Sequence, residues 1–147
     1  MSTEDAAFES IAKAILSGNE TAALEAANKA IDEGIGIDAI VMESVLKAWS
    51  DFCAWYEKDE KESLKAWLDI FNATLGLLKH LEAKTVQPKD RPFSVLVVTV
   101  LGEGHVLMRE ILATLLRARG LKVYTSRKGV RIGDLSEALA DPRLRFV

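Results

Sequence analysis

The sequence predicts an α+α/β protein: an N-terminal antiparallel four-helix bundle followed by a truncated doubly wound, Rossmann-like parallel α/β unit. Two observations support this fold class. Apolar residues recur at helical spacing from Phe8 to Leu81, in segments with short connections, as is typical of a helical bundle. At Phe93 the pattern changes to a continuous, β-branched apolar run that ends at Leu101. Such a run is typical of a strand buried on both faces of a parallel sheet.

Short helix-stop and helix-start signals divide the bundle into four segments. Gly18 and Asn19 end the first helix, and Asn19 is a suitable N-cap for the second. The second helix stops at Gly34, and Gly36 and Asp38 supply the next turn and cap. The residues expected to face the core are, helix by helix, Phe8, Ile11, Ala12, Ile15, Leu16; Leu24, Ala27, Ala30, Ile31; Val41, Val45, Trp49, Phe52; and Leu64, Trp67, Leu68, Phe71, Leu75, Leu78, Leu81.

Several individual residues of the bundle receive structural interpretations. Trp49 and Trp67 lie at helical spacing and are expected in the core. Cys53 has no local basic partner and is expected to be a small buried residue. His80 is expected on a helix surface, and the charged stretch 57–62 is expected to be a solvated turn.

The second half of the chain follows a proline-containing connection. Residues 84–92 contain Pro88 and Pro92 and are interpreted as a linker between a bundle at 1–83 and an α/β domain at 93–147. Strand and helix then alternate, as in a doubly wound unit. After the first strand the expected elements are a helix with the stripe Val106, Leu107, Ile111, Leu112, Leu115, Leu116 that ends at Gly120, a strand at 121–125, a short helix at 134–140 and a third strand at 144–147.

Composition restricts the class of partner and the compartment. The formal net charge is -3, and no stripe of Lys and Arg stands free of acids, so nucleic-acid binding is not expected. Cys53 is the only cysteine and cannot form an internal disulfide, which favours a reducing compartment. The longest apolar run, 93–101, is too short to span a bilayer, and the acidic start lacks a secretory signal. We therefore expect a cytoplasmic protein without membrane contact.

The loop Gly102-Glu103-Gly104-His105 follows the first strand, where open α/β sheets bind ligands. One interpretation is a dinucleotide-binding loop, but Leu107 stands where that motif needs a small residue. A phospho-acceptor receiver domain is a second interpretation, but Glu103 matches its acidic positions poorly. In that fold the chain also ends where the phosphorylated aspartate should be. His105 can also be a loop histidine that binds nothing.

The segment GEGHVLMREILATLLRARGLKV resembles, without gaps, the corrinoid (cobalamin)-binding module of methyl-carrier proteins and cobalamin sensors. The core of that family's segment is D-x-H-x-x-G. Glu103 falls on the acid, His105 on the histidine and Met108 on the glycine. The stretches AILSGNETAALEAANKAIDEGI and WYEKDEKESLKAWL look like the family's helical cap bundle, so the resemblance extends over nearly the whole chain.

The resemblance implies a cobalamin site. His105 is the implied ligand of the cobalt, and Glu103 would hold the other imidazole nitrogen, with Gly102 and Gly104 in the same loop. Trp55 is the best candidate for a cap contact over the cofactor.

The chain also departs from the family pattern. Met108 replaces the glycine that leaves room for the cofactor's nucleotide tail, and the loops that hold the tail would fall beyond Val147. Lys65 and Ala66 stand where a light-sensing branch carries its Glu-His pair.

Three hypotheses on function follow from the resemblance. The first is a cobalamin carrier, itself without catalytic residues, that works with methyltransferase partners. The second is a cobalamin-, tetrapyrrole- or light-responsive regulatory module that acts through protein contacts. The third is a non-binding dimeric remnant of the family. A sheet of two or three strands leaves apolar surface uncovered, so a homo-oligomer that completes the sheet is expected in each case.

Overall fold

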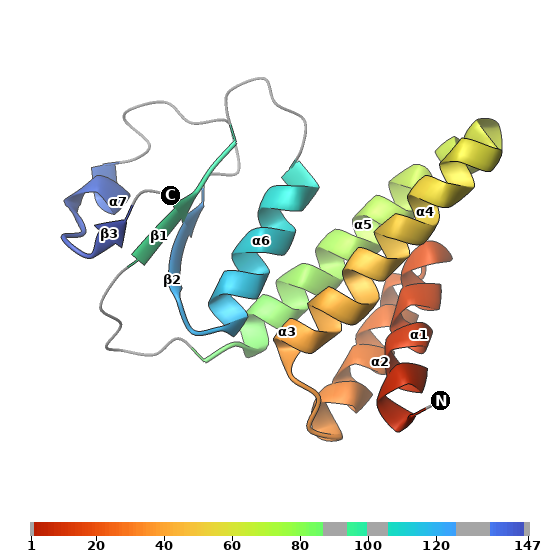
Figure 1. The fold of residues 1–147 in the computed structure, drawn as a ribbon, viewed down its shortest axis with the longest axis horizontal. Helices are drawn as coiled ribbons and strands as arrows, with labels where there is room; N and C mark the ends of the chain where they lie inside the picture. The colour runs from red at the N-terminus through yellow and green to blue at the C-terminus, as the bar shows by residue number, and fades with distance from the viewer. Residues whose placement is uncertain (1, 87–93, 100–105, 126–135, 146–147) are drawn as a thin grey trace. The chain divides into compact units, whose positions relative to one another are not determined.

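The computed structural model describes residues 2–86, 94–99, 106–125 and 136–145. The chain divides into two compact units, Met1–Ala83 and Lys84–Val147, which are described separately here. The first unit is helical, and the second contains a small parallel sheet (Figure 1). The protein is therefore of the α+α/β type, with most of its described residues in helices.

The helical unit contains two separate helices, then one interrupted helix, then one long helix. The interruption is a π-helical segment, η1, which continues directly into the helices on either side. The elements are α1 Thr3–Leu16, α2 Glu20–Asp32, α3 Ile37–Ile40, η1 Val41–Val45, α4 Leu46–Lys58 and α5 Glu60–Lys84.

Helix ends are fixed by local side chains, in part as the sequence predicts. Asn19 caps α2, because its Oδ1 accepts a hydrogen bond of 3.0 Å from the Ala22 N–H. Gly18, just before it, has a φ of +67°, and a Cβ there would lie 2.6 Å from the Cβ of Asp69. The expected Asp38 cap is wrong: Gly36 is the N-cap of α3, and Asp38 lies in its first turn.

Large aliphatic side chains from α1, α3, η1 and α5 form the core of the helical unit. Its completely buried members include Ile11, Ile15, Ile40, Val41, Val45, Ile70, Leu77 and Leu81. By contrast α2 buries only three alanines, Ala23, Ala27 and Ala30, while Leu24 remains half-buried. Small side chains on α2 permit a close approach to its neighbours, so the larger leucine is not needed to fill that space.

The stripe predicted for α5 is wrong in its first half. Leu64 is 52% exposed, Trp67 40% and Leu68 57%. The core-facing positions there are Ser63 and Ile70 instead. Apolar residues occupy a sector of α5 much wider than the surface its neighbours cover, and helical spacing alone does not show which part of a wide sector is buried.

The expectations for Trp49, Cys53 and His80 have mixed outcomes. Trp49 is half-buried, and its Nε1–H donates a 3.0 Å hydrogen bond to Thr74 Oγ1. Cys53 is exposed, which corrects the expectation of burial. His80 is half-buried rather than on the surface, and its Nε2 lies 2.8 Å from Asn28 Oδ1, so it joins α5 to α2.

The charged stretch 57–62 is exposed but is not a turn over its whole length. α4 continues to Lys58 and α5 begins at Glu60, with Asp59 alone between them. The Oδ1 atom of Asp59 accepts a hydrogen bond of 3.2 Å from the Glu62 N–H. This cap satisfies a backbone donor at the start of α5, so one residue is enough to separate the helices.

The second unit contains a three-stranded parallel sheet with the strand order β2-β1-β3. Gly120, with a φ of +77°, follows α6 as predicted and lets the chain turn into β2. The described elements are β1 Ser94–Val97, α6 Val106–Ala118, β2 Lys122–Thr125, α7 Ser136–Ala140 and β3 Leu144–Arg145.

The central strand is less buried than its sequence predicts. Of the predicted run 93–101, the structure describes 94–99, and β1 occupies only 94–97. Ser94 is buried, the next three residues are half-buried, and Val98 is 39% exposed. The expectation of a strand buried on both faces is therefore wrong for most of β1.

The carboxylate of Asp141 connects the beginnings of the three strands. It accepts hydrogen bonds from Ser94 Oγ at 3.1 Å and Tyr124 OH at 3.0 Å, and its side chain is only 5% exposed. Arg143 donates to it from both the backbone N–H, at 2.9 Å, and Nε, at 3.1 Å. Lys122 Nζ lies 3.7 Å from Asp141 Oδ2. The contacts from Arg143, together with the other donors, hold the pKa of Asp141 well below its ordinary value.

We predict that Asp141→Asn lowers the thermal stability of the α/β unit at pH 7. A depressed pKa in the folded state stabilises the fold fully above the unfolded pKa of about 4, and this stabilisation is lost as the pH falls further. The difference between wild type and variant should therefore shrink below about pH 4. Protection of the β1 and β2 amides from hydrogen exchange measures the stability of the unit in both proteins. Asp51→Asn, which breaks an exposed pair with Lys47, is the control and should change little. A difference that stays constant with pH would contradict the assignment.

A second prediction compares two buried hydroxyls of the helical unit. Ser44 Oγ is completely buried in η1 and has no hydrogen-bond partner in the described structure. Thr74 Oγ1 donates to the Ile70 carbonyl at 2.7 Å and accepts from Trp49. Ser44→Ala should leave the free energy of unfolding unchanged or raise it by about 1 kcal/mol, whereas Thr74→Val should lower it by about 1 kcal/mol. Urea unfolding measures both. A large loss in Ser44→Ala would show that its hydroxyl has a partner.

Candidate functional site

The strand order of the second unit defines where a ligand site belongs. β1 is central, with β2 on one side and β3 on the other, and both pair with it in parallel. The chain passes through α6 to reach β2, and it then crosses to the opposite side of β1 to form β3. In open α/β sheets such a reversal creates a crevice at the carboxyl ends of the strands, and ligands bind there. Thr99 is the last described residue beyond β1 on that side.

A buried arginine links α6 to the segment just beyond β1. Arg109 is 4% exposed, and its Nη1 donates to Thr99 Oγ1 at 3.2 Å. Its Nε and Nη2 both donate to Glu110 Oε1, at 3.1 and 2.8 Å. A buried guanidinium needs such partners, because an uncompensated charge in the interior is costly. The Arg109–Thr99 hydrogen bond therefore joins the first half of α6 to the segment just beyond the central strand.

Sequence reasoning did not identify Arg109 as a residue of this region. An arginine followed by a glutamate on an amphipathic helix is usually solvent-exposed, and nothing in the spacing distinguishes this pair. The one available signal was its place in the first turns of a helix that follows a strand end.

Four of the predicted site residues, Gly102, Glu103, Gly104 and His105, lie outside the described residues. Met108 lies in the first turn of α6, and its side chain is 56% exposed. It therefore does not fill the core of the unit. By sequence, His105 immediately precedes Val106, the first residue of α6.

Trp55, the predicted cap contact, belongs to α4 in the helical unit. It is half-buried, and its ring meets Phe52 edge to face, with centroids 6.2 Å apart and an interplanar angle of 85°. Within the described ranges, no group of three or more His, Cys, Asp or Glu side chains is arranged to hold a metal ion.

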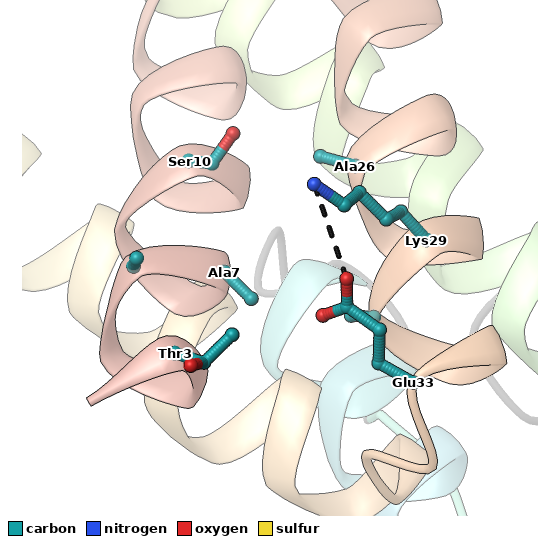
Figure 2. Close-up of a pocket in the computed structure, with 8 residues that line it drawn as sticks. Thr3, Ala7, Ser10, Ala26, Lys29 and Glu33 are labelled. Atoms are coloured by element: carbon teal, nitrogen blue, oxygen red, sulfur yellow. Dashed lines mark ion pairs between the residues drawn. The ribbon is translucent and has the colours of Figure 1, made fainter.

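The helical unit contains a small groove between α1 and α2, shown in Figure 2. Its volume is about 160 Å³, and Ala6, Ala7, Ala26 and Ala30 form much of its wall. Lys29 and Glu33 lie at its edge, with Nζ and Oε1 3.9 Å apart, and the Lys29 side chain is 78% exposed. An exposed pair of this kind is weak, and alanine methyl groups supply no chemistry. The groove therefore arises from packing between two small-residue helices.

Comparison with known proteins adds no family to these observations. No family model matches the chain, and no curated protein is significantly similar to it. Among the helices in the described part of the chain, none combines the length and the apolar character needed to cross a membrane.

Proposed function

We propose that this protein binds a corrinoid (cobalamin) and carries it as a methyl-transfer cofactor between partner proteins. The observation that supports the proposal is the strand order β2-β1-β3, with its reversal at the central strand. The segment that joins β1 to α6, at the ligand-binding edge of such a sheet, contains Gly102-Glu103-Gly104-His105. In the proposed fold the helical unit is an antiparallel four-helix cap bundle, and the second unit is the first part of a Rossmann-like domain.

The residues near this edge are compatible with a cobalamin. His105 would be the ligand of the cobalt, which requires a neutral imidazole. Its position next to the N-terminus of α6 disfavours the imidazolium, because free backbone N–H groups carry partial positive charge. Glu103 would accept a hydrogen bond from the second ring nitrogen and so fix the tautomer.

Met108 and Arg109 bear on how the cofactor would be accommodated. Met108 occupies the position of the family's glycine, but its exposed side chain is flexible and is not locked in the core. The Arg109–Thr99 hydrogen bond joins the first turns of α6 to the segment just beyond β1, and it would help to keep the connection between them in place. The bound cobalt would supply the methyl-accepting centre, and the protein would supply ligation and position.

A regulatory role is the second candidate. The exposed apolar residues on α4 and α5 favour a module that acts through protein contacts, since such surfaces mark interaction sites. Under either role, the proposed partners are a methyltransferase or a regulatory protein, together with a second copy of the chain, in the cytoplasm. The half-buried β1 is compatible with further strands or a partner that covers the sheet.

The test is to mix the full-length protein with hydroxocobalamin, separate unbound cofactor by gel filtration, and record the absorption spectrum. We expect co-elution and a spectral change that indicates histidine ligation, and His105→Ala should abolish that change. The other histidine of the chain supplies the matched control: His80→Gln keeps a hydrogen-bonding group opposite Asn28 and should bind as wild type does. An unchanged spectrum without co-elution, or the same spectral change in His105→Ala, would refute the proposal.

A further inference from the structure

The helical unit has an apolar surface that its own packing leaves open. It is formed by Cys53 and Tyr56 of α4 and by Leu64, Trp67 and Leu68 of α5, and we call it the α4–α5 face. Tyr56 is 40% exposed, Leu64 52%, Trp67 40% and Leu68 57%. A groove of about 480 Å³ runs between the two helices here, lined by Phe52, Cys53, Tyr56, Glu57, Leu64 and Trp67. Tyr56, Leu64 and Trp67 line this groove, and Leu68 lies one helical turn after Leu64 on α5, so the four side chains form a patch rather than scattered exposure.

The aromatic residues of the face are held in place before any partner arrives. The Trp67 ring stacks on Phe71, with centroids 5.0 Å apart and an interplanar angle of 21°. The Tyr56 hydroxyl donates a hydrogen bond of 3.1 Å to Glu60 Oε1. Preordered aromatic side chains lose little entropy on binding, and Trp and Tyr are the residues most often found at the energetic centre of interfaces.

We infer that the α4–α5 face is the contact surface between two copies of this chain. Each large apolar residue exposes roughly 100 Å², so the face presents roughly 400 Å² and two copies would bury about 800 Å² of it. This is about half of the roughly 1,600 Å² that a standard interface buries, so the area suits a weak, reversible dimer. Two copies related by a two-fold axis bring the same apolar face together from both sides, so no second kind of surface is needed.

The charges at the border also suit a second copy. Glu57 lines the groove from α4, and Lys61 precedes Leu64 by three residues on α5, so the two charges border the face from different helices. Both side chains are exposed. A two-fold axis parallel to the helices places α4 of one copy over α5 of the other, and so brings Glu57 opposite Lys61. A border of mixed sign is self-complementary, whereas nucleic acid or a strongly acidic peptide would require a basic border.

The first experiment is sedimentation velocity on the full-length protein between 1 and about 300 μM, at low and high salt. We expect a monomer–dimer equilibrium, and Leu68→Glu should weaken it at least tenfold because it places a charge among the apolar residues of the face. Met42→Glu is the matched control, since Met42 is 43% exposed but lies in η1, outside the face. It should dimerise as wild type does. Circular dichroism should show unchanged helix content in both variants.

Charge exchange tests the pairing itself. Glu57→Lys and Lys61→Glu should each weaken the dimer several-fold, and the double variant should restore it, because the opposite charges meet again. A merely structural role of these exposed residues would not produce that rescue.

Three results would overturn the inference. One is a monomer over the whole concentration range. Another is a dimer that Leu68→Glu leaves intact, which would place the interface elsewhere, as in sheet completion. The third is a cobalamin complex that Leu68→Glu abolishes in a monomeric protein, which would assign the face to the cofactor. The inference does not depend on corrinoid binding, since His105→Ala should leave the dimer unchanged.

Discussion

The buried carboxylate of Asp141 is the interaction on which the arrangement of the small sheet depends. β1, β2 and β3 contribute few residues each, and short parallel strands have little backbone hydrogen bonding to hold them in register. Asp141 lies at their amino ends and accepts hydrogen bonds from Ser94, Tyr124 and Arg143, so it joins the first strand, the second strand and the turn before the third. The opposite ends of the strands are thereby oriented together, and that edge is where the candidate site lies.

Arg109 plays the corresponding role near the carboxyl ends. Its contacts with Thr99 and Glu110 connect α6 to the exit of β1 without contributing any known chemistry of their own. Asp141 and Arg109 are both ionised groups with buried side chains, which are 5% and 2% exposed. Buried charges are retained only when they are fully paired, and here each joins segments that are separate in the sequence. A sheet this small therefore relies on polar contacts at both ends of its strands as well as on apolar packing.

The sequence predicted those features that depend on local stereochemistry. The Asn19 cap, the ends of helices at Gly18 and Gly120, and the change from helical to strand pattern all follow from the conformational preferences of individual residues. Burial depends instead on which neighbours a helix has. Trp67 and Leu68 were expected in the core and are exposed, because Ser63, Thr74 and other small residues of α5 face its neighbours. Cys53 is exposed for a related reason, since it lies beside the uncovered half of α5.

Of the candidate site, the loop 102–105 stays a prediction of the sequence, and the contacts at the start of α6 were not predicted. Arg109 and Thr99 are ten residues apart and on different elements, and no spacing rule brings such a pair together. The fold explains why the two proposals are separable. His105 belongs to the α/β unit, whereas the α4–α5 face belongs entirely to the helical unit. The proposed cobalt ligand and the α4–α5 face therefore draw on different residues, although Trp55, the predicted cap contact, belongs to α4 as well. Substitution in one can therefore leave the chemistry of the other intact.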